Sequence, residues 1–308
     1  MMYPKDQILK IAALKRERNA IILAHNYQIP EVQDVADYHG DSLGLAVEAG
    51  KTDAKVIVLC GVHFMAETCA ILNPQKLVLL PEREAGCPMA DMVTPEDVIQ
   101  MRREHPGATV VAYVNTSAAV KAEADYCCTS ANAAAVVAAC PSGPVIFVPD
   151  KNLGAHAAKL AGREVILYPG FCPTHERLTV TDIMLARKAH PDARVIVHPE
   201  CRAEVRDIAD AVLSTGGMDG YVKQSDAAEF IIGTECGMLY PLGKANPTRR
   251  FYLPGANPML CPNMKLTTVG SVVRSLTNLE EKITVPDEIA RRAKIAIDRM
   301  MEIGRRER

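Results

Sequence analysis

The chain has 308 residues, of which 48% are hydrophobic and 23% are charged, as in an ordinary soluble globular protein. Its formal net charge of −2 offers no basic field to nucleic acid or anionic lipid. Ten cysteines and no tryptophan are its unusual counts. The start of the chain lacks an apolar signal core, and no apolar run approaches the roughly 18 residues of a membrane span. We therefore expect a cytoplasmic protein whose thiols stay reduced, rather than a disulfide framework.

Amphipathic helices are predicted near both ends of the chain, at residues 6–18 and 286–305. Between them, short β-branched runs alternate with helical patterns. Three of these runs open in the same way, at residues 21–27, 110–115 and 195–200. Because the runs are almost continuously apolar, they indicate parallel strands in sheets that are covered on both faces.

The three runs mark the start of three copies of one unit. We take His25, Tyr113 and His198 as equivalent anchors. A hydroxyl side chain stands 17 residues after each anchor, and a proline stands 56 residues after it, followed closely by a cysteine. The hydroxyls are Ser42, Ser130 and Thr215, the prolines Pro81, Pro169 and Pro254, and the cysteines Cys87, Cys172 and Cys261. Equivalent residues lie 85 to 89 positions apart, which predicts a tandem threefold repeat.

Each unit is expected to run strand, helix, helix, strand, helix, strand. In the second unit these elements are predicted at 109–115, 118–125, 132–139, 145–149, 154–160 and 164–168. Capping-box spacings at Thr94 and Thr179 predict helices that link the units. We expect an α/β fold of three homologous αβα sandwich domains with parallel sheets, in pseudo-threefold symmetry around a central active site. The predicted domains are 1–105, 106–190 and 191–308.

Polar side chains gather where the predicted parallel strands end, which is where such units bind ligands. The first strands of the three units end in His25 and Tyr27, in Tyr113 and Asn115, and in His198 and Glu200. The three matched hydroxyls lie at helix starts, where hydroxyl and amide groups bind carboxylate or phosphate. For any one hydroxyl alone, simple helix capping is the better interpretation. Three hydroxyls at one spacing favour a shared cavity.

The ten cysteines divide into two sets. Cys87, Cys172 and Cys261 lie in proline- and glycine-rich loops after the last strand of each unit. The other seven fall in strands, helices or their ends, where free cysteine usually serves packing. Three thiolates would form a metal centre with an open fourth position. Zinc with one water and a [4Fe–4S] cluster with one iron open to substrate both satisfy this pattern, and spacing alone does not choose between them.

The sequence resembles the quinolinate synthase family from about residue 21 to residue 268. The segments that carry the resemblance are Ala-His-Asn-Tyr at 24–27, Gly-Asp-Ser at 40–42, Tyr-Val-Asn at 113–115, Cys-Thr-Ser-Ala-Asn at 128–132, Pro-Asp-Lys-Asn-Leu-Gly at 149–154, His-Pro-Glu at 198–200, Ser-Thr-Gly at 214–216 and Cys-Pro-Asn-Met-Lys at 261–265. The resemblance implies a [4Fe–4S] cluster on Cys87, Cys172 and Cys261, with the open iron as a Lewis acid. It also implies that iminoaspartate condenses with dihydroxyacetone phosphate to give quinolinate, phosphate and two waters, in de novo NAD biosynthesis.

The resemblance further implies roles for individual side chains. Those that would bind the carboxylates and phosphate of the substrates are His25, Ser42, Ser130, His198 and Thr215. Tyr27, Tyr113 and Glu200 would perform acid–base chemistry, and Tyr113 and Glu200 would also contact the substrate. Asn115 would position the substrate, and His175, three residues after Cys172, would be a further catalytic residue in the same cavity. Iminoaspartate hydrolyses readily, so an aspartate-oxidising enzyme would supply it.

Two other hypotheses stay open from the residues alone. One is a zinc enzyme of the same build that acts on a phosphorylated or dicarboxylic metabolite. The other is a non-enzymatic iron–sulfur sensor, which is weaker because a sensor needs no polar cavity and usually carries a basic DNA-reading element. One feature departs from some relatives, which have a C-x-x-C-x-x-C run at the last cysteine. Here Cys261 is the only thiol in that run, which excludes a local disulfide switch there.

Overall fold

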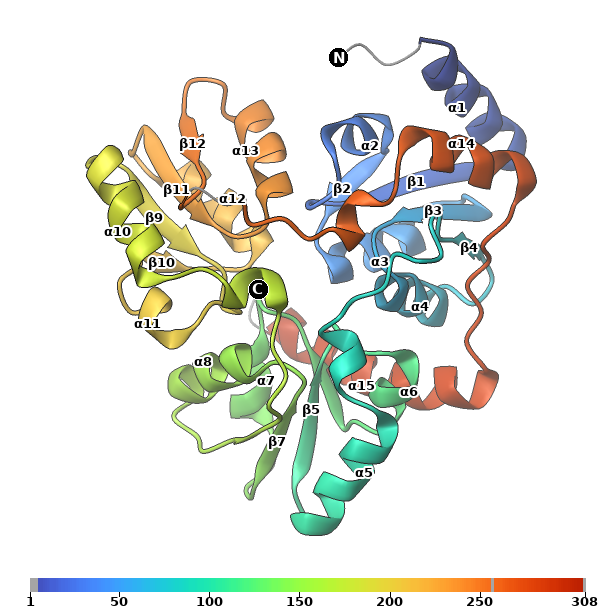
Figure 1. The fold of residues 1–308 in the computed structure, drawn as a ribbon. Coiled ribbons are helices and arrows are strands. Elements are labelled where there is room, and N and C mark those ends of the chain that lie inside the picture. The colour runs from blue at the N-terminus through green and yellow to red at the C-terminus, as the bar shows by residue number, and fades with distance from the viewer. Residues whose placement is uncertain (1–4, 256–257, 307–308) are drawn as a thin grey trace. The chain divides into compact units, whose positions relative to one another are not determined.

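The computed structural model describes residues 5–255 and 258–306, and it is an α/β protein with three parallel four-stranded sheets (Figure 1). The strands are β1 Ala20–His25, β2 Tyr38–Gly40, β3 Val56–Cys60, β4 Leu77–Leu79, β5 Thr109–Tyr113, β6 Tyr126–Cys128, β7 Val145–Val148, β8 Ile166–Leu167, β9 Arg194–Val197, β10 Ala211–Val212, β11 Glu229–Gly233 and β12 Arg250–Tyr252. The sheet orders are β2-β1-β3-β4, β6-β5-β7-β8 and β10-β9-β11-β12, so all three share one topology. The predicted α/β class with parallel sheets is confirmed.

Helices cover both faces of each sheet, as the apolar strands require. The helices are α1 Lys5–Arg18, α2 Pro30–Val35, α3 Ser42–Lys51, α4 His63–Leu72, α5 Pro95–Glu104, α6 Ala118–Ala122, α7 Ala133–Ala139, α8 Lys151–Ala161, α9 Pro173–Glu176, α10 Val180–Ala189, α11 Ala203–Arg206, α12 Thr215–Gln224, α13 Leu239–Ala245, α14 Val269–Asn278 and α15 Asp287–Arg306. On the first sheet, α1, α2 and α14 pack together over one face. Similar apolar clusters join α5 and α6 to the second sheet and α10 and α11 to the third.

The chain divides into two compact units. One comprises the residues up to 87 together with 261–294, and it contains the first sheet. The other comprises residues 88–260 together with those from 295 onward, and it contains the second and third sheets. The first unit is therefore discontinuous in sequence, because α14 belongs to it.

The predicted linker and terminal helices are present. Thr94 caps α5 and Thr179 caps α10, each in a full capping box with an aspartate three residues later. A third capping box, which sequence reasoning missed, starts α14 at Thr268. Each of these three threonines stands seven residues after one of Cys87, Cys172 and Cys261, so the same helix start follows each of the three loops.

The predicted order of elements within a unit was incomplete. The helix expected at 118–125 ends at Ala122, and Tyr126–Cys128 forms a strand beside β5. Equivalent edge strands, β2 and β10, occur in the other two sheets. Strands of two or three residues contain no usable hydrophobic period, which is why the sequence pattern did not reveal them.

An aspartate immediately precedes each of these edge strands, at Asp37, Asp125 and Asp210. Its carboxylate accepts the N–H of a residue near the start of the central strand, at 2.8 Å in the first two sheets and 2.7 Å in the third. In each sheet, a basic side chain from the helix that precedes the central strand pairs with this carboxylate. The three basic residues are Lys15 of α1, Arg102 of α5 and Arg187 of α10. This repeated contact fixes the start of the edge strand beside the central strand.

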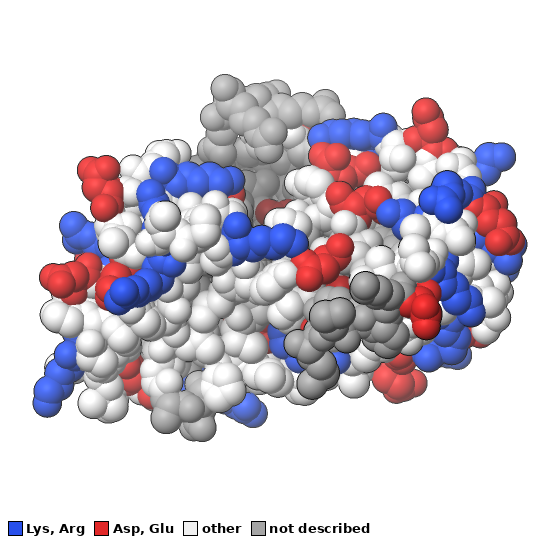
Figure 2. Space-filling model, turned by 90° about the horizontal axis from the view of Figure 1, so that it is seen from above, with Lys and Arg blue, Asp and Glu red and all other residues white. Residues whose placement is uncertain are grey.

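None of the helices that the structure describes combines the length and the apolar character needed to cross a bilayer. On the face that Figure 2 shows, basic and acidic side chains are intermingled rather than gathered by sign.

Candidate active site

The predicted polar residues lie at the carboxyl ends of the central strands. His25 is the last residue of β1 and Tyr113 the last of β5, while His198 follows β9 directly. All three are buried, with 6%, 5% and 4% of their surface exposed. Asn115 is half-buried in the turn after β5. The strand-end placement inferred from the sequence is therefore correct for these side chains.

Glu200 is the centre of a hydrogen-bonded group in the second compact unit. The Tyr113 hydroxyl lies 2.7 Å from Glu200 Oε1, and His175 Nδ1 lies 2.7 Å from Glu200 Oε2. The carboxylate is only 3% exposed. Burial opposes its ionisation, but His198 and His175, together with the hydrogen bonds from His175 and Tyr113, hold the pKa of Glu200 below its usual value. Glu200 is thus a buried carboxylate that remains ionised.

His175 connects this carboxylate to the cysteine loop. Its Nδ1 lies 3.1 Å from Cys172 Sγ, and its Nε2 lies 2.8 Å from Thr234 Oγ1. Its ring stacks on that of His198, with centroids 4.7 Å apart. Sequence reasoning missed Thr234, although it directly follows β11 and the same strand-end rule would have found it.

His25 and His198 share one local geometry in two different sheets. The N–H of Tyr27 donates to His25 Nδ1 at 3.1 Å, and the N–H of Glu200 donates to His198 Nδ1 at 3.3 Å. Because Nδ1 accepts, the neutral form of either ring carries its proton on Nε2, which is then a donor suited to an anionic ligand. Burial, with His175 and His156 nearby, lowers the pKa of His198 to about 3 despite Glu200, so its ring is neutral at pH 7.

The predicted hydroxyls do not cap their own helices. Ser42 is the first residue of α3, but Asp41 is the cap and accepts the N–H of Gly44 at 2.7 Å. Thr215 is the first residue of α12, but Ser214 is the cap and accepts the N–H of Gly217 at 3.2 Å. Ser130 lies in the turn that leads into α7. The capping alternative is therefore wrong for Ser42 and Thr215.

The cysteines separate as the loop pattern predicted, with one exception. The thiols of Cys87, Cys172 and Cys261 are partly exposed, as is that of Cys236, whereas the other six are buried. Burial raises the pKa of Cys69 and Cys127 to about 12, and it raises that of Cys140 to about 11. Thiols of this kind do not supply thiolates at pH 7.

Two of the three predicted ligand loops are tied together in the first compact unit. Asn263, two residues after Cys261, donates to the carbonyl of Gly86, next to Cys87, at 2.8 Å. The third, Cys172, is the residue just before the short helix α9 in the other unit. There the donor atoms of Cys172, His175 and Glu200 lie within 4.8 Å of one another, close enough for a metal ion. The donor chemistry therefore suits a thiolate-bound metal group.

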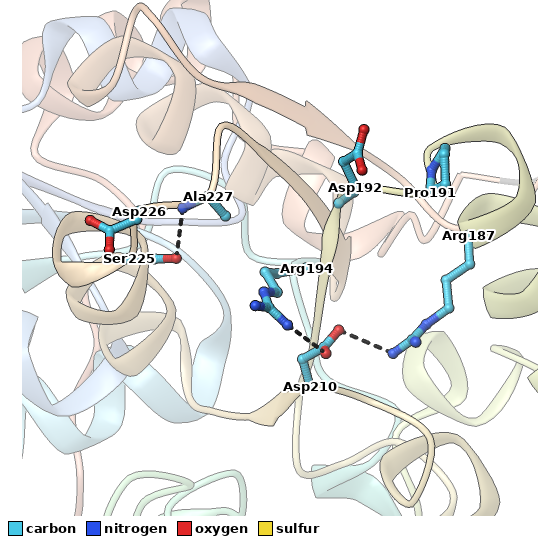
Figure 3. Close-up of a pocket in the computed structure, with 9 residues that line it drawn as sticks. Arg187, Pro191, Asp192, Arg194, Asp210, Ser225, Asp226 and Ala227 are labelled. Atoms are coloured by element: carbon cyan, nitrogen blue, oxygen red, sulfur yellow. Dashed lines mark hydrogen bonds and ion pairs between the residues drawn. The ribbon is translucent and has the colours of Figure 1, made fainter.

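Two polar pockets lie at the opposite, amino-terminal ends of the strands. In the third sheet a pocket of about 590 Å³ surrounds Asp210, which pairs with Arg187 at 3.0 Å and Arg194 at 3.5 Å (Figure 3). The second sheet has an equivalent pocket of about 420 Å³ around Asp125 and Arg102. Since the charges pair within the chain and support edge strands, neither pocket is assigned to catalysis.

Comparison with known proteins provides independent information. Residues 9–302 match the family model described as Quinolinate synthetase A protein. A protein of Dehalococcoides mccartyi strain BAV1 named quinolinate synthase is 53% identical over 294 residues, which cover 96% of this chain and 97% of that protein. The protein of that name in Geotalea uraniireducens is 52% identical over 305 residues, covering 99% and 100%. The one in Methanoregula boonei is 54% identical over 294 residues, covering 96% and 97%.

Proposed function

The chain belongs to the quinolinate synthase family of enzymes, and from that premise we propose that it condenses iminoaspartate with dihydroxyacetone phosphate. The products are quinolinate, one phosphate and two waters, so all atoms of the two substrates are accounted for. The product would enter de novo NAD biosynthesis in the cytoplasm. An aspartate-oxidising enzyme would supply iminoaspartate, which hydrolyses too readily to be stored.

The hydrogen-bonded group around Glu200 is the observation that carries this proposal. Ring formation with loss of water and phosphate needs proton donors and acceptors within hydrogen-bond reach of the reacting atoms. An ionised Glu200 can accept a proton, and the Tyr113 hydroxyl 2.7 Å away can return one. His175 holds the second carboxylate oxygen and so orients the pair. Tyr27, beside His25, is the proposed acid–base residue of the first sheet.

Neutral polar groups would bind the anionic parts of the substrates. The Nε2–H donors of His25 and His198 and the hydroxyls of Ser42, Ser130 and Thr215 are the proposed partners of carboxylate and phosphate. Ser42 and Thr215 begin helices of ten residues each, where backbone N–H groups also favour negative charge. Asn115 would position the substrate at the end of β5.

Cys87, Cys172 and Cys261 are the residues that would hold a [4Fe–4S] cluster. These three thiols are partly exposed and lie in loops, whereas the fourth partly exposed thiol, Cys236, begins a short 3-10 helix. Buried thiols with raised pKa values are poor alternatives. When bound, the cluster would supply an open iron that acts as a Lewis acid on a substrate oxygen. One thiol per predicted domain, with domains at 1–105, 106–190 and 191–308, agrees with the proposed pseudo-threefold arrangement around one active site.

The test is anaerobic purification and iron–sulfur reconstitution, followed by assay of quinolinate by chromatography. Iminoaspartate would be generated in the cuvette by an aspartate oxidase, with dihydroxyacetone phosphate in excess. We expect about four irons per chain and quinolinate formation that depends on both substrates. A colourless protein with stoichiometric zinc, or an iron-loaded protein that forms no quinolinate, would contradict the proposal.

A further inference from the structure

A buried carboxylate, Asp150, lies behind the loop that carries Cys172. It is 0% exposed. Its Oδ1 accepts the N–H of Leu153 at 2.7 Å and so caps α8, while its Oδ2 accepts the N–H of Cys172 at 3.1 Å. One carboxylate therefore serves both a helix start and the backbone of a proposed cluster ligand.

Helix capping alone does not explain a carboxylate at this position. Thr94, Ser117 and Thr179 cap other helices of the chain with a single hydroxyl, and the aspartate that caps α3, Asp41, is only partly buried, unlike Asp150. Burying a carboxyl group is costly unless both of its oxygens have hydrogen-bond partners, and both oxygens of Asp150 have one. A hydroxyl would cap α8 equally well. It has only one oxygen, however, whereas the second oxygen of Asp150 also accepts the Cys172 N–H.

The segment around Asp150 also holds the loop just before Cys172. Asp150 forms a parallel β-bridge with Gly170, and the N–H of Lys151 donates to the Gly170 carbonyl at 2.8 Å. The two backbones lie so close that a Cβ on Gly170 would stand 2.5 Å from the carbonyl oxygen of Pro149. The loop is thus fixed against this segment two residues before the cysteine.

The same segment holds the chain after Cys172. Lys151 pairs with Glu176, at the end of α9, at 3.0 Å, and the Asn152 amide donates to Glu176 at 2.7 Å. The Asn152 amide also donates to the carbonyl of Glu200 at 3.1 Å. Contacts on both sides of Cys172 and on Glu200 therefore converge on three consecutive residues.

We propose that Asp150 is a positioning residue that holds the Cys172 backbone in the conformation in which its thiolate retains the cluster. Asn152 ties the same segment to Glu200. The inference rests on the proposed cluster ligation by Cys172. Loss of a residue that is hydrogen-bonded to a metal ligand typically lowers metal affinity by about 10- to 100-fold. Removing Asp150 Oδ2, the acceptor for the Cys172 N–H, should therefore weaken binding of the cluster while all three cysteine ligands remain.

The experiment follows iron transfer from anaerobically reconstituted full-length protein to a coloured ferrous chelator. Asp150→Ser keeps a capping hydroxyl for α8 but removes the acceptor for Cys172, and Asp150→Asn keeps the size of the side chain. Asp182→Asn is the matched control, because that carboxylate accepts the N–H of Thr179 at 3.0 Å at the start of a different helix. We expect iron release about 10-fold faster from both Asp150 variants, with iron-free circular dichroism and melting temperature close to those of the wild type.

Each other outcome is informative. A wild-type protein that takes up no iron would overturn the cluster proposal itself. A wild-type protein that holds iron no longer than Asp150→Ser would overturn only the role of Asp150. Release from Asp182→Asn as fast as from the Asp150 variants would also overturn that role, because the effect would then be general. An Asp150→Ser chain that is unfolded without iron would count against it too, since a hydroxyl cap should preserve α8.

Discussion

The hydroxyl of Tyr113 lies 2.7 Å from Oε1 of Glu200, although 87 positions separate the two residues in the sequence. Tyr113 ends β5 of the second sheet, and Glu200 follows β9 of the third. The pair exists because the carboxyl ends of two parallel sheets carry matched polar residues in the same compact unit. In the proposed reaction, a hydroxyl held against a buried, ionised carboxylate would relay a proton without any rearrangement beforehand.

Replacement of Glu200 by glutamine should lower turnover by about 100- to 1,000-fold, because the proton acceptor is lost while the shape is kept. Iron content and melting temperature should stay close to those of the wild type. Glu204→Gln, on the exposed side of α11, is the control and should be fully active. Normal quinolinate formation by Glu200→Gln would remove this residue from the mechanism.

Substitution of the three loop cysteines should abolish iron binding. Cys87→Ser, Cys172→Ser and Cys261→Ser are each expected to lose the visible absorption of the cluster and all activity. Cys69→Ser should retain both, because its thiol is buried in α4. Iron retained by Cys87→Ser and lost by Cys69→Ser would show that the ligand assignment is wrong.

Adjacent residues at the start of α12 should separate substrate binding from stability. Ser214→Ala removes the helix cap and should cost about 1 kcal/mol of unfolding free energy with little change in KM. Thr215→Ala should raise KM for a substrate several-fold and leave the melting temperature nearly unchanged. Steady-state kinetics and thermal melts of the two variants check this, and identical profiles would contradict separate roles.

Acid should destabilise the protein partly through His156. Burial, with Arg206 and Lys159 nearby, lowers its pKa to about 4 in the folded chain, against 6.5 for an unperturbed histidine. Between these values the unfolded chain binds more protons, so stability falls as the pH falls from about 6.5 to about 4. Allowing for partial exposure, the contribution is about 1 kcal/mol. Urea unfolding at pH 7 and pH 5 should show a smaller loss for His156→Gln than for the wild type, whereas the exposed His39→Gln should match the wild type.

Much of this architecture was predictable from the sequence. Strongly apolar strands, the capping boxes at Thr94 and Thr179 and the strand-end histidines are local signals, and each has the predicted structure. Edge strands of two or three residues were not predictable, because their register depends on a carboxylate such as Asp125 rather than on a hydrophobic pattern. The pairing of Tyr113 with Glu200 and the contact of Asp150 with Cys172 depend on side-chain direction across distant elements, which a single sequence does not reveal.

The packing of α14 on α1 and the first sheet has a consequence for synthesis on the ribosome. The last strand of that sheet ends at Leu79, whereas α14 begins at Val269, 190 residues later (269 − 79). At about 5–20 residues per second, the nascent sheet keeps part of an apolar face uncovered for about 10–40 s. The loop of Cys261 also emerges only at the end of that interval. Premature termination before α14 should therefore yield an aggregation-prone chain, and loading of the proposed cluster would have to follow synthesis of Cys261.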